Sequence, residues 1–303
     1  MKKRNSLIEL YRFLFALNVL KGHGMFPYQG PYFGPASISV EFFFVLSGFL
    51  LLGSIKKYLD LPFLKAFSRF IFSKIKPLII PLIITIPFNI AYSLITNNTG
   101  NILDINIWGF LWYIKTMLLV FTGYFILRYF IRKEWIFNMI LVGFFITSAI
   151  LHIMPEHYDW GIVRAAMSIS LGMIMSYIPK INIDKPKLLW LALIPIQIAI
   201  LIIMFFGYSK YLIIEEILDL ILYPALIYIT FQIPFNNKVL NYLGSLSFGL
   251  YAFQCVCRTL VEIGLKDIWT IFLIIVILTL AEDSVKRLYK HYKNKQKLSV
   301  IGG

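Results

Sequence analysis

Residues 10–24 of the chain read LYRFLFALNVLKGHG. The stretch is apolar enough for a membrane helix, yet it carries Arg12 near one end and His23 near the other. Ionisable groups inside a membrane segment are costly and generally face the protein interior, where they serve binding, catalysis or packing. The stretch therefore predicts a membrane fold and, within it, a polar site that needs its own explanation.

The composition extends this prediction to the whole chain of 303 residues. Hydrophobic residues make up 59% and charged residues only 15%, against roughly 25% charged residues in soluble domains. Apolar stretches of roughly 17 to 25 residues, the length that crosses a bilayer, recur with short polar breaks. They predict an all-α polytopic membrane protein with about ten transmembrane helices in one bundle, over residues 7–22, 37–54, 77–95, 107–128, 135–153, 161–178, 188–207, 212–231, 242–263 and 268–285.

The formal charge of +14 raises the question of a nucleic-acid partner. Most of the Lys and Arg residues fall in alternate loops and in the tail, and the opposite loops hold only Lys210 and Lys266. This is the asymmetry of the positive-inside rule. It predicts cytoplasmic N- and C-termini and the lipid bilayer as the partner, with no nucleic acid.

The chain shows no internal repeat and no linker, so we expect a single membrane domain over residues 1–303 with a basic cytoplasmic tail at about 286–303. The first apolar segment follows MKKR but is interrupted by charges, and we expect it to be retained rather than cleaved. The basic, aromatic link over residues 56–77 suits a helix along the anionic inner leaflet.

The charged residues of the first helix permit two interpretations. Arg12 and His23 differ by about 20° in direction and by ~16 Å in depth on a straight helix, and Glu9 lies within about 60° of Arg12. Glu9 and Arg12 could form a purely structural ion pair, with His23 at the interface. Alternatively, Glu41 of the next helix, at a depth comparable to His23, could orient the imidazole as a general base.

Three motifs carry a resemblance to a known family. Arg12 and His23 are separated by ten residues, the second helix contains SVEFFFVLSGF at residues 39–49, and a late segment reads LGSLSFGLYAFQ at residues 243–254. In these motifs the chain resembles the bacterial membrane acyltransferase-3 family, whose members O-acetylate surface sugars and related acceptors. Weaker similarities are GFLWYI at 109–114, Arg164 with LGM at 171–173, and Glu282.

The resemblance implies cytoplasmic acetyl-CoA as the acyl donor, with no bound cofactor, and a hydroxyl of a cell-surface or exported saccharide as the acceptor. It implies His23 and Glu41 as catalytic residues and a cell-membrane, multi-pass location. We expect donor or cavity contacts from the remaining candidates, which are Arg12, Lys74, Lys76, Trp112, Lys115 and Arg164.

The sequence also departs from the family pattern. Gln254 and Phe110 stand where many members have His, so neither receives a proton-transfer role, and the usual Arg-x-Arg appears as Lys74-Ile-Lys76. His152 and His157 flank Met-Pro-Glu, but Pro155 prevents a helical ligand arrangement and no metal site is expected.

Two alternatives stay open at this level. His23 could act as general base or form an acyl-histidine. A polysaccharide or lipid-linked sugar transporter would share the helices and buried charges, although the chain lacks a corresponding pair of broken helices in two halves.

Overall fold

The computed structural model describes residues 5–22, 36–95, 112–154, 161–180, 186–206 and 216–301. Within these ranges the regular structure is entirely helical, with eleven α-helices and short 3₁₀ and π turns. The α-helices are α1 (Ser6–Gly22), α2 (Ala36–Ile55), α3 (Phe63–Ile75), α4 (Ile79–Ile95), α5 (Trp112–Phe130), α6 (Glu134–Ile153), α7 (Gly161–Met175), α8 (Pro186–Phe206), α10 (Tyr223–Gln232), α11 (Lys238–Glu262) and α12 (Ile268–Ile301). The expected all-α class is confirmed.

All ten apolar segments predicted from the sequence form helices over their described residues, except that the segments 161–178 and 242–263 end in turns at 176–178 and at 263. Four helical stretches are long and apolar enough to cross a membrane: Ser39–Tyr58, Phe63–Tyr92, Glu134–Ile153 and Ile268–Tyr289. Shorter apolar helices cover Gly161–Met175, Lys187–Ile203 and Leu218–Gln232. The chain is therefore an integral, multi-pass membrane protein, and the number of ten crossings stays a prediction.

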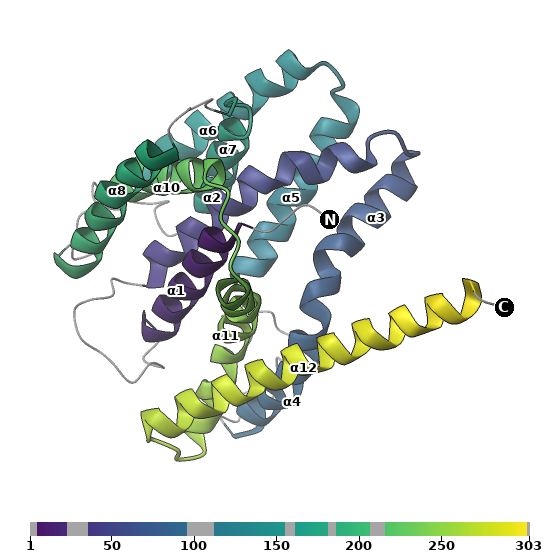
Figure 1. Ribbon diagram of the computed structural model, residues 1–303, viewed down its shortest axis with the longest axis vertical. Coiled ribbons are helices and arrows are strands. Elements are labelled where there is room, and N and C mark those ends of the chain that lie inside the picture. Colours follow the sequence, from purple (N-terminus) through teal and green to yellow (C-terminus); the bar gives the residue numbers. More distant parts are fainter. Residues whose placement is uncertain are drawn as a thin grey trace.

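Helix α1 lies in the middle of the bundle, between α2 and α11 (Figure 1). Helix α7 packs along α2 and also contacts α5 and α6, whereas α4 and α12 pack on α11. Helices α8 and α10 form a pair at one side. The start of α1 is fixed to the end of α10, because the Asn5 side chain donates to the carbonyl oxygens of Thr230 and Ile233 at 2.8 and 2.9 Å.

Glycines at three of the quoted motifs mark close helix crossings. A Cβ atom on Gly48 of α2 would overlap the Ile169 carbonyl oxygen of α7, and one on Gly172 of α7 would overlap the Val45 carbonyl oxygen. A Cβ on Gly244 of α11 would overlap the Glu9 side chain of α1. The absence of a side chain at these points lets the helices approach backbone to backbone. These motifs thus position the helices that carry the charged residues.

The basic link contains α3, as the sequence predicted, but α3 continues through a 3₁₀ turn (Lys76–Leu78) directly into α4. The tail is helical as well, because α12 runs on to Ile301 instead of ending near residue 285. Ion pairs spaced i, i+4 support this extension: Glu282 with Lys286, and Asp283 with Arg287 at 2.7 Å. The far end of α12 projects away from the other helices in Figure 1.

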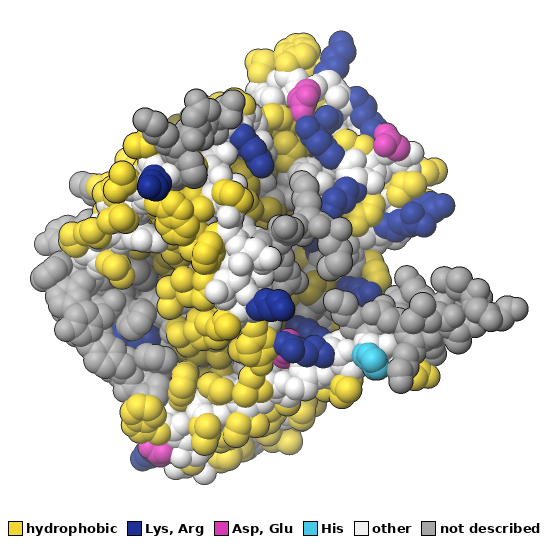
Figure 2. All heavy atoms as spheres, viewed as in Figure 1, with side chains coloured by type: hydrophobic (Ala, Val, Ile, Leu, Met, Phe, Trp, Pro, Cys, Tyr) yellow, Lys and Arg dark blue, Asp and Glu magenta, His cyan; other side chains and the backbone are white. Residues whose placement is uncertain are grey.

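Hydrophobic side chains cover much of the outer surface in Figure 2. Large apolar residues such as Met139, Leu201 and Trp269 are 60–67% exposed, which is the expected arrangement when lipid rather than water surrounds the bundle. Lys and Arg gather where α3 and the connections next to it lie. The distribution agrees with a protein that has an apolar belt and one strongly basic end.

Candidate active site

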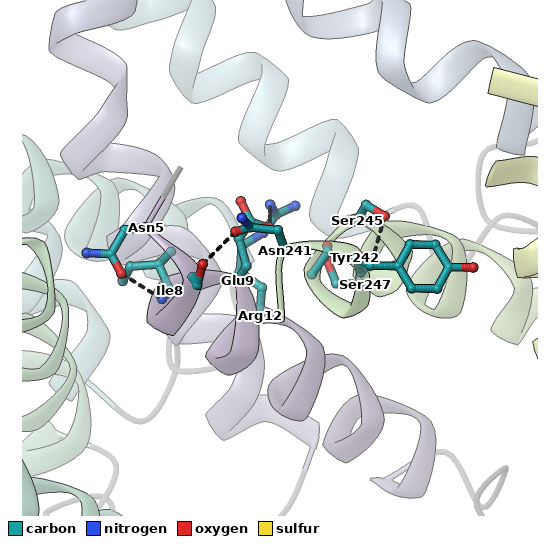
Figure 3. A network of polar contacts seen from close by, with 10 residues as sticks. Asn5, Ile8, Glu9, Arg12, Asn241, Tyr242, Ser245 and Ser247 are labelled. Carbon is teal, nitrogen blue, oxygen red and sulfur yellow. Dashed lines mark hydrogen bonds and ion pairs between the residues drawn. The ribbon is translucent and has the colours of Figure 1, made fainter. Parts of the chain in front are cut away.

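The N-terminal half of α1 carries a charged pair beside α11. Arg12 Nη1 donates to Glu9 Oε2 at 2.9 Å, which confirms the ion pair expected from their i, i+3 spacing. Ser6 Oγ donates to Asn241 Oδ1 at 2.9 Å, and Figure 3 shows Glu9 and Arg12 beside Asn241. The Glu9 side chain is only 10% exposed, whereas that of Arg12 is 32% exposed. Glu9 thus orients the guanidinium and leaves part of it accessible to a ligand.

A second charged pair joins α2 to α7. Glu41 is 2% exposed, and its Oε1 accepts from Arg164 Nε at 2.7 Å and is 2.6 Å from Arg164 Nη2. Its Oε2 accepts from Ser168 Oγ at 2.7 Å. The Arg164 guanidinium also lies over the Trp112 ring of α5, 5.9 Å from the centroid. A buried ion pair is tolerated only when such additional hydrogen bonds compensate its desolvation.

The contact between α1 and α2 uses the opposite side of α2. Asn18 Nδ2 of α1 donates to Ser39 Oγ of α2 at 2.6 Å. Since Ser39 and Glu41 are two residues apart, their side chains point about 200° apart on the helix. Glu41 is therefore engaged by α7, and its expected pairing with His23 lies outside the described residues because His23 follows the last described residue of α1.

An aromatic cluster lies between the two charged pairs. The Tyr113 ring of α5 contacts Phe44 of α2 at 4.6 Å and Tyr251 of α11 at 5.4 Å between centroids. Both Arg12 and Glu41 lie within electrostatic range of its hydroxyl. Tyr113 therefore links the α1–α11 region with the α2–α7 region.

The two lysines of Lys74-Ile-Lys76 have different environments. Lys74 Nζ donates to Ser54 Oγ at 3.0 Å and lies over the rings of Phe70 and Phe121, at 5.3 and 5.2 Å. None of the ion pairs found in the described ranges includes Lys74. Lys76 is exposed. Lys74 thus presents a partly buried cation between α2, α3 and α5.

The structure separates the other candidates. Trp112 and Arg164 lie together near Glu41. Lys115 is exposed one turn further along α5, so its side chain does not join this group. The polar site therefore consists of two parts, one around Arg12 and one around Glu41, with Tyr113 between them.

Sequence reasoning missed Ser168 and the partner of His152. Ser168 lies one turn after Arg164 and binds the same carboxylate. Their i, i+4 spacing could have shown that the two side chains share one helix face. His152 at the end of α6 is 3.4 Å from Glu216, and Asp219 is buried in the π turn (Leu218–Leu222) that follows. The wide separation of residues 152 and 216 along the chain gave no signal for this contact.

A polytopic helical bundle with buried charged pairs defines a membrane protein with an internal polar site. A family model described as an acyltransferase domain matches residues 5–281, which is nearly the whole chain. The chain belongs to this family, acyltransferase family 3, and is an acyltransferase. No curated protein and no solved structure gives a significant match.

Proposed function

We propose that the protein transfers an acetyl group from cytoplasmic acetyl-CoA to a hydroxyl of a cell-surface or exported saccharide, in the cytoplasmic membrane of a bacterium. The observation that carries this proposal is the arrangement along α1. Arg12 is partly exposed in its first half, and His23 directly follows its last residue, Gly22. Family membership favours this enzyme over a sugar transporter.

The donor requires cations for its phosphates. Lys74, without a carboxylate partner in the described residues, and the exposed Lys76 supply positive charge at the basic end of the bundle. Arg12 offers a guanidinium closer to the middle, where it can bind polar groups of the pantetheine arm. We assign donor binding to these three residues.

The reaction requires a base for the acceptor hydroxyl. In the proposed step the hydroxyl oxygen forms a bond to the thioester carbonyl carbon while its proton moves to His23. The carbon–sulfur bond then breaks, and the CoA thiolate leaves and takes up the proton. The apolar surroundings keep out water, which would otherwise compete for the acyl group.

Glu41 supports this step through its contacts with α7. We propose that its carboxylate, fixed by Arg164 and Ser168, contributes negative potential that stabilises the His23 imidazolium. Trp112, held against Arg164, is proposed to line the acceptor side of the site. Lys115, which is exposed, is proposed to contact the acceptor at the surface.

The proposal is tested with radiolabelled acetyl-CoA added to membranes that contain or lack the protein. We expect label in a surface or exported glycan only when the protein is present. Label that appears in no glycan, with native acceptors supplied, would contradict the proposal.

A further inference from the structure

Gln254 of α11 carries a buried acceptor without a hydrogen bond. The residue is 1% exposed, and its Oε1 has no partner among the described residues. Other buried polar groups of the same helix are satisfied, since Ser247 Oγ donates to Gly244 O at 2.8 Å and Thr259 Oγ1 to Phe88 O at 2.8 Å. Buried side-chain acceptors are generally paired. Other buried atoms of the described residues, such as Arg128 Nε and Tyr177 Oη, also lack a partner, so the position of Gln254 decides whether its oxygen faces a ligand.

The level of Gln254 in the bundle follows from the contacts between α1 and α11. These helices run parallel, because Ser6 contacts Asn241, Glu9 contacts Gly244, and Ala16 and Leu20 pack in one cluster with Leu250 and Phe253. Counting the same number of residues onward from Glu9 on α1 and from Gly244 on α11 places Gly22 level with residue 257 of α11. Gln254 is therefore about 4.5 Å nearer the start of the helices than Gly22.

The side on which Gln254 lies is the side of the candidate active site. Gln254 and Tyr251 are three residues apart and so are neighbours on the α11 surface. The Tyr251 ring contacts Tyr113, which lies within electrostatic range of Arg12 and Glu41. The free acceptor is thus one turn beyond the aromatic cluster, at a level between Arg12 and the end of α1.

We infer that Gln254 Oε1 accepts a hydrogen bond from the N–H of the pantetheine amide nearest the thioester. This inference rests on acetyl-CoA as the donor. Two methylene groups separate that amide from the thioester sulfur. Their length is comparable to the offset along the helix axis between Gln254 and the end of α1. The thioester would therefore lie at the end of α1, where His23 follows in the sequence. A neutral amide oxygen suits this contact, because a carboxylate there would also repel the developing thiolate.

The test compares two donors with the full-length protein in membranes. One is acetyl-CoA, and the other is its analogue in which an ester oxygen replaces this amide N–H. For the wild type we expect kcat/KM to fall roughly tenfold with the analogue, as for one lost hydrogen bond in a buried site. With acetyl-CoA, the kcat/KM of Gln254→Met should lie below that of the wild type by about the same factor. With the analogue, Gln254→Met and the wild type should have the same kcat/KM.

Two further variants sharpen the result. Gln254→Glu, protonated in this buried setting, retains an acceptor and should recover part of the preference for acetyl-CoA. Ser247→Ala, on the same helix, should keep the full wild-type preference. Without donor, Gln254→Met should unfold at the same temperature as the wild type or higher, because it removes an unpaired polar group, whereas a purely structural role would lower that temperature.

An equal preference for acetyl-CoA in the wild type and in Gln254→Met would overturn the inference, and a sugar hydroxyl would then be the partner to examine. Unchanged kcat/KM in Gln254→Met would also overturn it. A wild type that transfers acetyl from neither donor would refute the proposed function, and this inference with it, before any variant is compared.

Discussion

At the scale of single residues, the two arginines of the site differ in how many contacts fix their side chains and in how exposed they are. Arg164 is clamped by Glu41 and lies on Trp112, with 13% of its side chain exposed. Arg12 has one carboxylate partner and is 32% exposed. The first is therefore suited to fixing the geometry of the site, and the second to contacting a substrate.

Arg12→Ala should raise the KM for acetyl-CoA about tenfold, since a charge-assisted contact to the donor is lost. The KM for the acceptor should change less than twofold. Kinetics with each substrate varied in turn check this, with Arg12→Lys as a variant that retains the charge. An unaltered KM for acetyl-CoA would remove Arg12 from the donor site.

Glu41→Ala should destabilise the protein by roughly 3–5 kcal/mol, because Arg164 would stay buried without its counter-ion. Thermal unfolding in detergent measures the effect. The matched control is Glu134→Gln, which removes the pair with Lys56, 2.9 Å apart and about half exposed on both sides; it should cost about 0–1 kcal/mol. Similar losses in the two variants would argue against a buried, structurally important pair.

Whether the sequence predicts an ion pair of the site depends on how far apart its two residues are along the chain. The Glu9–Arg12 pair followed from helical spacing alone. The Glu41–Arg164 pair joins residues 123 positions apart, and its formation depends on how α2 meets α7. Spacing could show that burying both side chains is energetically costly, but it could not show that they pair with each other.

At the scale of elements, the glycines explain why particular helices meet. Gly48 and Gly172 bring α2 and α7 into backbone contact, and this contact sets Glu41 opposite Arg164 and Ser168. The sequence singled out these glycines within short motifs, but a small residue does not show which helix packs against it. The positions of the helices were predictable from hydrophobic length, whereas their pairing required the three-dimensional structure.

Gly172→Ala should lower both the unfolding temperature and the acyltransferase activity, because its Cβ would overlap the backbone of α2. Gly143→Ala of α6 is the control, since a Cβ there has no atom within 4 Å; it should leave stability unchanged or raise it slightly, by up to about 1 kcal/mol. Equal tolerance of both substitutions would contradict the close α2–α7 crossing.

At the scale of the whole molecule, the charge distribution and the helical bundle together predict the orientation in the membrane. Positive residues concentrate at one end, where α3 lies. The hydrophobic surface and the four long apolar helices agree with a multi-pass protein. In the proposed mechanism the donor enters from the basic end of the bundle, and the acceptor enters from the opposite end.

The orientation can be tested with single cysteines in a background in which Cys255 and Cys257 are replaced by alanine. A cysteine at Lys266 should react with a membrane-impermeant maleimide added to intact cells. A cysteine at Lys133, between α5 and α6, should react only after the cells are opened. The reverse pattern would invert the predicted topology.

The central claim is that acyl transfer takes place where α1 ends, with His23 as the base. The most direct test is acetyl transfer from labelled acetyl-CoA by His23→Ala, compared with His291→Ala, whose side chain lies exposed on α12. Both variants must be present in the membrane at the level of the wild type. We predict that His23→Ala loses transfer by about 10²-fold or more and that His291→Ala retains it; wild-type turnover in His23→Ala would contradict the account.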